Sequence, residues 1–148
     1  LLAQYNFCID LNEGMVKKSE NVRLTLNQKA RELDKQKQDF QTKYQNNAYL
    51  SPERAQQEYN RIAKLEQDLQ TLSNKLQSEL MSENEKNSLQ LRDSINAFLK
   101  EYNKTKGYSM IISNTGFDNL LYADSIYNIT KEIVEGLNAR YSSPAPKK

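Results

Sequence analysis

Apolar residues form one narrow stripe along the first third of the chain. They recur at steps of eleven and of seven: Leu11, Val22, Leu33 and Tyr44, and again Leu26, Leu33 and Phe40. Both spacings keep one face of a long helix apolar, and the eleven-residue step relaxes the left-handed supercoil that strict heptads impose. The pattern therefore predicts a long, thinly apolar helix that ends near Tyr44.

A second helical stripe follows a short break. It alternates steps of three and four and then continues toward Tyr102: Ile62, Leu65, Leu69, Leu72, Leu76, Leu80, Leu91, Ile95 and Phe98. In the break, Ser51 is a good N-cap and Pro52 suits the first helical position. A short connection between two long helices favours an antiparallel pair. We expect a helical hairpin over residues 15–87 with its tip at 46–52, and a polar interval at 82–87 where the helices can splay.

The two ends of the chain predict a different, compact body. Residues 1–11 are apolar-rich, residues 108–113 and 120–123 resemble strands around a turn, and Thr130 is placed to cap a helix over 130–141. We assign residues 1–14 and 88–148 to this body, with a disordered tail at 142–148. The predicted class is mainly α with a small β part. Two strands and one helix are too small a core to stand alone, which indicates an oligomer.

Composition excludes most kinds of catalytic site. The 148 residues are 37% hydrophobic and 27% charged, with mean hydropathy −0.87, which favours an extended helical protein over one large core. There is no His and a single Cys, Cys8, so a Cys/His metal or nucleophile site is not expected, and Cys8 is expected to pack as a small apolar residue. No Gly-rich phosphate loop occurs. We expect no catalytic residue, no metal and no cofactor.

The charge is unevenly distributed. Residues 15–46 carry eight basic and four acidic residues, whereas residues 53–106 carry nine of each. The ordinary interpretation is a solvated helix face. The alternative, nucleic-acid binding by the basic arm, predicts steeply salt-dependent affinity for DNA; no specific nucleic-acid partner is expected.

The order of these elements resembles the Skp (OmpH-like) family of periplasmic chaperones. The matching segments are 50–55 at the hairpin tip (Leu-Ser-Pro-Glu-Arg-Ala), 92–103 entering the body, 111–115, 121–123 and 129–134. The tip and body-entry segments are most similar to the versions found in Bacteroidetes-type bacteria. The resemblance covers nearly the whole chain, and its motifs are structural.

The resemblance implies a homotrimer in the periplasm. In that family, strands of three subunits form a shared β-barrel body, and three helical hairpins project as tentacles around a cavity that holds unfolded outer-membrane β-barrel proteins without ATP. The family body also has a strand before the first helix, whereas this chain begins inside that helix at Leu1, so we expect either that the strand lies upstream or that the trimer is compromised. Enterobacterial members are more basic than the net charge of +2 here, so only weak contact with an anionic membrane surface is expected.

Two functions follow from these observations. The first is an ATP-independent holdase in outer-membrane protein biogenesis, whose tentacle offers sparse apolar anchors to an unfolded chain: Phe40, Tyr44, Tyr49 and Leu50. For Phe40 and Tyr44 the alternative is packing in the helical seam. The second is a structural coiled-coil adaptor or spacer that binds one folded envelope partner. The residues expected in the body core and oligomer interface are Met110, Ile111, Ile112, Leu120, Leu121, Tyr122, Ile133 and Leu137.

Overall fold

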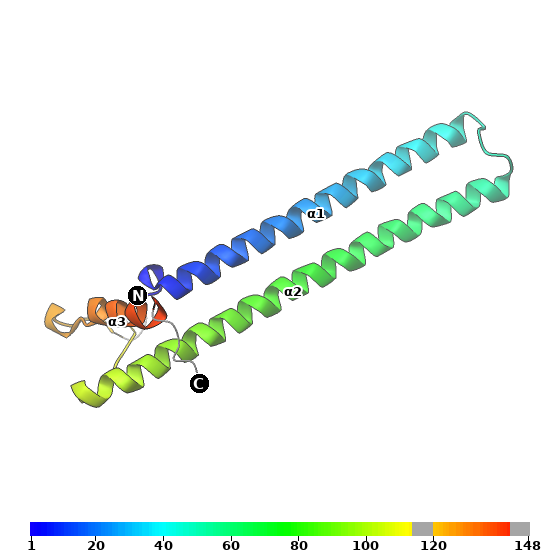
Figure 1. The fold of residues 1–148 in the computed structure, drawn as a ribbon. Helices are drawn as coiled ribbons and strands as arrows, with labels where there is room; N and C mark the ends of the chain where they lie inside the picture. The colour runs from blue at the N-terminus through cyan, green and yellow to red at the C-terminus, as the bar shows by residue number, and fades with distance from the viewer. Residues whose placement is uncertain (114–119, 143–148) are drawn as a thin grey trace. The chain divides into compact units, whose positions relative to one another are not determined.

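Helices account for most of the chain in the computed structural model, which describes residues 1–113 and 120–142 (Figure 1). The two long helices are α1, Asn6–Gln45, and α2, Pro52–Lys106, of 40 and 55 residues, or about 60 and about 80 Å at 1.5 Å per residue. The shorter elements are η1 at Leu2–Gln4, η2 at Ser125–Tyr127 and α3 at Thr130–Ser142. The predicted mainly helical fold with a long helical hairpin is confirmed.

The chain divides into two compact units. One comprises Gly14–Asn84, and the other combines Leu1–Glu13 with Glu85–Lys148. We call the first the hairpin unit and the second the body unit. Helix α2 runs without interruption from one unit into the other, through the polar interval at 82–87.

The hairpin unit consists of two antiparallel helices (Figure 1). A thin apolar seam holds them together. Only Leu33, Ala55 and Ile62 are buried there. The other seam residues are half-buried, and they include Met15, Val22, Leu26, Leu65, Leu69, Leu72, Leu76 and Leu80. Ion pairs between the helices join Lys18 to Glu83 and Lys37 to Glu66. The narrow stripe predicted from sequence is thus the seam itself.

The body unit has a small but well-defined core. Its buried residues are Tyr5, Cys8, Ile133 and Leu137. Half-buried residues of α1 and α2 and the residue before α3 pack around them: Phe7, Leu91, Ile95, Phe98, Leu99, Tyr102 and Ile129. Cys8 packs as the small apolar residue expected, and two of the predicted core positions, Ile133 and Leu137, lie in this core.

Polar contacts fix the start of α1 against α3 in the body unit. The side chain of Asn138 accepts a hydrogen bond from the backbone N–H of Asn6 (2.8 Å) and donates one to the carbonyl of Gln4 (2.9 Å). The Tyr141 hydroxyl donates to Asp10 Oδ2 at 2.7 Å. Because the first N–H groups of a helix have no partner within the helix, Asn138 supplies one from another element.

The predicted strands do not form in the single chain. Neither 108–113 nor 120–123 is a strand, and the predicted turn at 114–119 lies outside the described residues, as does most of the predicted tail. Met110, Ile112, Leu121 and Tyr122 are 77%, 57%, 98% and 84% exposed. An isolated pair of strands is marginal without a further layer to cover its apolar face, which explains why local β-propensity alone does not produce a sheet here.

The helix ends largely follow the sequence signals. Gly107 has φ +70° after the last residue of α2, as expected of a C-cap glycine. The backbone N–H of Arg54 donates to Ser51 Oγ at 3.3 Å, so the predicted N-cap of α2 is confirmed. The predicted N-cap of α3 is wrong: Thr130 is already helical, and its N–H donates to the side chain of Asn128 at 3.0 Å.

Candidate functional site

Backbone hydrogen bonds define the conformation of the turn at the tip of the hairpin. Asn47 adopts a left-handed conformation with φ 50°. The N–H of Ala48 donates to the carbonyl of Lys43 at 2.9 Å, and that of Asn47 to the carbonyl of Tyr44 at 3.2 Å. This is the hydrogen-bond pattern of a Schellman motif, in which Asn is the usual substitute for Gly. The chain therefore leaves α1 in a defined direction.

Four aromatic side chains meet beside this turn. Phe40 is the centre: its ring centroid lies 5.9 Å from that of Tyr44, 5.6 Å from Tyr49 and 6.2 Å from Tyr59. These separations lie within the 4.5–7 Å range of favourable ring contacts. We call Phe40, Tyr44, Tyr49 and Tyr59 the tip aromatic cluster.

The tip aromatic cluster is only partly covered. Tyr44 and Tyr59 are 63% and 57% exposed, whereas Phe40 and Tyr49 are half-buried. Phe40 thus contributes to the seam as well as to the surface. Tyr44 lies at the end of the seam with its ring largely in solvent.

The structure brings together three of the four residues predicted to bind a client. Leu50 stands apart, 95% exposed and without a ring contact. Tyr59 was missed, although it continues the three-four spacing of the apolar stripe of α2. Its spacing of four from Ala55 and three from Ile62 would have placed it next to the seam.

Two charges beside the tip aromatic cluster are paired with each other. Arg61 and Glu58 form an ion pair with an N–O distance of 2.6 Å, and hydrogen bonding to Arg61 lowers the pKa of Glu58. Desolvation, followed by the negative charge of Glu58, raises the pKa of Tyr49 above its usual value. The Tyr49 hydroxyl therefore stays neutral at physiological pH.

A small cavity adjoins the cluster in the groove between α1 and α2. Its volume is about 250 Å³. It is lined by Lys37, Phe40, Tyr59, Ile62, Ala63 and Glu66. Lys37 Nζ lies 2.7 Å from Glu66 Oε1, so the charged groups of the lining are paired with each other. A second cavity of about 260 Å³ lies nearer the middle of the hairpin, beside Leu33 and Gln36.

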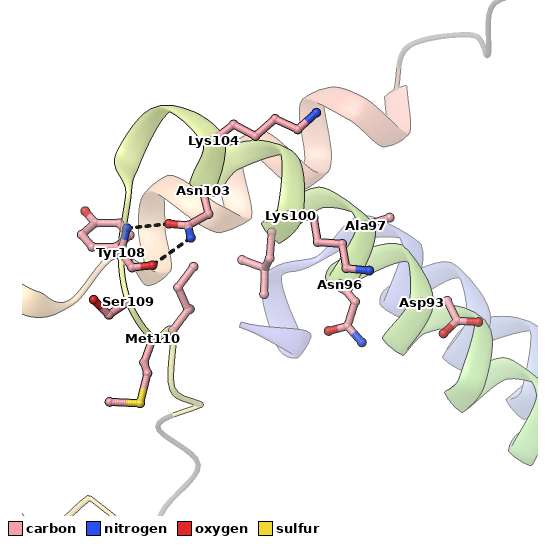
Figure 2. Close-up of a pocket in the computed structure, with 11 residues that line it drawn as sticks. Asp93, Asn96, Ala97, Lys100, Asn103, Lys104, Tyr108, Ser109 and Met110 are labelled. Atoms are coloured by element: carbon pink, nitrogen blue, oxygen red, sulfur yellow. Dashed lines mark hydrogen bonds between the residues drawn. The ribbon is translucent and has the colours of Figure 1, made fainter.

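The body unit exposes a second apolar surface. A cavity of about 530 Å³ lies among residues of 108–112 and 120–130, including Ile126 and Tyr127, which are 76% and 74% exposed. A larger, open hollow of about 730 Å³ lies between α2 and the segment that follows it (Figure 2). Of the four exposed predicted interface residues, Met110 and Ile112 line the cavity of about 530 Å³, whereas Leu121 and Tyr122 do not. Ile111 and Leu120 are half-buried.

The side chain of Asn103 fixes the start of the segment that follows α2. Asn103 Nδ2 donates to the carbonyl of Tyr108 at 2.9 Å, and the N–H of Tyr108 donates to Asn103 Oδ1 at 2.7 Å (Figure 2). The amide of Asn103 thereby pairs with the backbone of Tyr108 at two points. The direction in which residues 109–113 leave α2 is set by this pair.

The basic arm of the hairpin is partly neutralised. Of its basic residues, Lys18, Arg23 and Lys37 form ion pairs with Glu83, Glu20 and Glu66. Across the described residues, no group of three or more metal-ligating side chains comes together. None of the helices in 1–113 or 120–142 has the length and apolarity required to cross a membrane.

Comparison with known families decides the identity of the chain. The family model described as outer membrane protein (OmpH-like) matches residues 1–137 of the 148. The chain belongs to the OmpH-like family. No curated protein sequence matches it. OmpH-like proteins are periplasmic chaperones rather than enzymes, and the long helical hairpin described above is consistent with that family.

Proposed function

We propose that this OmpH-like chain is an ATP-independent holdase that binds unfolded outer-membrane β-barrel proteins in the periplasm and prevents their aggregation. The observation that carries the proposal is the surface of the hairpin unit. Its exposed apolar residues are few: Tyr44 and Tyr59 belong to the tip aromatic cluster, and Val16, Leu24, Leu50 and Met81 lie outside it. They stand among charged and amide side chains of two long helices.

Such a surface suits a holdase for a physical reason. Each isolated apolar side chain contributes a small, non-directional gain on burial. Many such contacts hold an unfolded chain without imposing one conformation on it, which is how promiscuous binders tolerate different partners. A folded adaptor partner would instead require a contiguous complementary patch.

We further propose that the working form is a homotrimer in which 108–113 and 120–123 pair as strands between subunits. The support is the exposure of Met110, Ile112, Leu121 and Tyr122 in the single chain. Large apolar side chains exposed together on a segment without strand partners are characteristic of an interface. On this proposal Ile111 and Leu120 complete the shared sheet.

The test is light scattering of a urea-unfolded outer-membrane barrel protein diluted into buffer, with and without this protein and with no nucleotide. We expect aggregation to be suppressed near one trimer per client, and equally for a second, unrelated barrel. Unchanged aggregation with a protein shown to be trimeric contradicts the holdase. Binding to one folded envelope protein and to no unfolded barrel would establish the adaptor instead.

A further inference from the structure

The cavity beside the tip aromatic cluster has the size of one side chain. Its volume is about 250 Å³, and an apolar cavity of about 150 Å³ is sufficient to bind benzene. A phenyl or phenol group with its methylene therefore fits, whereas a folded element does not.

The walls of the cavity favour a ring over an aliphatic group. Phe40 and Tyr59 both line it, with ring centroids 6.2 Å apart and an interplanar angle of 53°. A third ring placed against either of them gains edge or offset contacts in addition to the area it buries, whereas Leu gains only the area. Ile62 and Ala63 add apolar surface to the lining.

The electrostatics of the cavity select against a charged occupant. Lys37 and Glu66 are paired with each other at 2.7 Å, and the neighbouring Glu58 and Arg61 are paired at 2.6 Å. The four charges balance, so neither an anionic nor a cationic group finds an unpaired partner. An uncharged aromatic ring is the complementary ligand.

From these contacts we propose that the cavity is a subsite for one Phe or Tyr side chain of an unfolded polypeptide. The inference rests on the proposed holdase function and specifies what the hairpin binds: aromatic side chains in particular, not apolar residues in general. Unfolded outer-membrane barrels supply such side chains, because their strands carry aromatic girdles at both membrane interfaces.

The experiment compares two disordered synthetic peptides of equal length and charge. One alternates Tyr and Phe with polar residues, and in the other every aromatic residue is replaced by Leu. Dissociation constants are measured by fluorescence anisotropy of a terminal dye. We expect the aromatic peptide to bind about two- to tenfold more tightly to the wild-type protein, the range that ring contacts provide.

Filling the cavity provides the matched variant. Ala63→Trp places a ring in the cavity from within, whereas Gln67→Trp adds the same ring at an exposed position of α2 outside the lining. The chain contains no Trp, so the emission of each variant reports where its indole lies. We expect a blue-shifted emission and loss of the aromatic preference for Ala63→Trp, and neither change for Gln67→Trp.

Each outcome decides the proposal. Equal affinity of the wild type for both peptides, or no detectable binding of either, overturns the aromatic subsite. Tighter binding of the aromatic peptide that persists in an Ala63→Trp variant with blue-shifted emission also overturns the aromatic subsite. If the Ala63→Trp emission is not blue-shifted, the cavity does not accept a ring, and the inference is again overturned. Light scattering with the unfolded barrel is run in parallel. Suppressed aggregation together with equal affinity for the two peptides would support the holdase function and contradict the aromatic subsite.

Discussion

Gly136 of α3 lies directly against the ring of Phe98 of α2. A Cβ at position 136 would clash with Cζ of that ring and fall 2.8 Å from its Cε2, far inside the 3.5–4.0 Å of an ordinary carbon contact. The absence of a side chain at Gly136 is therefore what allows α3 to approach α2 and to bury Ile133 and Leu137.

The first prediction concerns this contact. Gly136→Ala should lower the free energy of unfolding by about 1–3 kcal/mol, the usual range for overpacking, although Ala is the better helix former by about 1 kcal/mol. Urea unfolding followed by circular dichroism measures the change. The matched control is Gly14→Ala in α1, where a Cβ meets nothing within 4 Å; this variant should be more stable than the wild type. If Gly136→Ala and Gly14→Ala changed the free energy of unfolding equally and in the same direction, the packing explanation would be refuted.

The second prediction concerns Asn138, whose side chain joins α3 to the backbone at Gln4 and Asn6. Asn138→Ala removes both hydrogen bonds and leaves a helix N-terminal N–H without a partner, so we expect a loss of about 1–2 kcal/mol. Asn138→Asp keeps the acceptor for Asn6 and should be intermediate. Hydrogen exchange at the Asn6 amide should be faster in Asn138→Ala than in Asn138→Asp. Exchange unchanged in both variants would show that Asn138 does not cap α1.

The third prediction is a loss of stability at alkaline pH. Desolvation, reinforced by the neighbouring Glu132 carboxylate, raises the pKa of Tyr102 to about 12, above its ordinary value of about 10. The folded state therefore retains a proton that the unfolded state releases. The stabilisation is complete below pH ~10 and is lost as the pH rises toward ~12.

Absorbance at 295 nm tests this assignment. Among the nine Tyr residues, Tyr102 should ionise late, and Tyr102→Phe should remove one tyrosinate from the high-pH end of the titration. A Tyr102→Phe curve that differs from the wild type only near pH 10 would contradict the shifted pKa.

The fourth prediction concerns the proposed trimer. Ile112→Asp places a carboxylate in the apolar interface and should dissociate the oligomer, because an unpaired charge is costly to bury. Native mass spectrometry or light scattering gives the mass. Gln90→Asp, at an exposed position of α2 outside 108–113 and 120–123, is the control for added charge and should leave the mass unchanged. An Ile112→Asp protein of wild-type mass would remove Ile112 from the interface.

Sequence reasoning succeeded where a local rule acts on neighbouring residues. Ser51 begins α2 and Gly107 ends it, because capping depends on a few adjacent backbone groups. The same reasoning failed at Thr130, which is already helical and whose N–H donates to the side chain of Asn128 two residues earlier. It also failed at 108–113, because a strand requires a partner that local sequence does not specify.

In the candidate site, too, the sequence indicated the individual residues but not how they come together. Phe40, Tyr44 and Tyr49 were predicted as separate anchors, and the structure assembles them around Phe40 with Tyr59 from the other helix. Tyr59 lies nineteen positions beyond Phe40 in the chain, so only the closed hairpin brings the two rings together. The cavity beneath them depends on that pairing.

The sequence by itself determined the helices, the position of the tip and the apolar seam, because periodicity and capping are properties of consecutive residues. Tertiary structure alone decided that Gly136 admits Phe98, that Asn138 caps a helix more than a hundred residues away, and that four aromatic rings share one surface. These contacts join residues distant along the chain, and their geometry is set by how closely the helices pack, which no local pattern encodes.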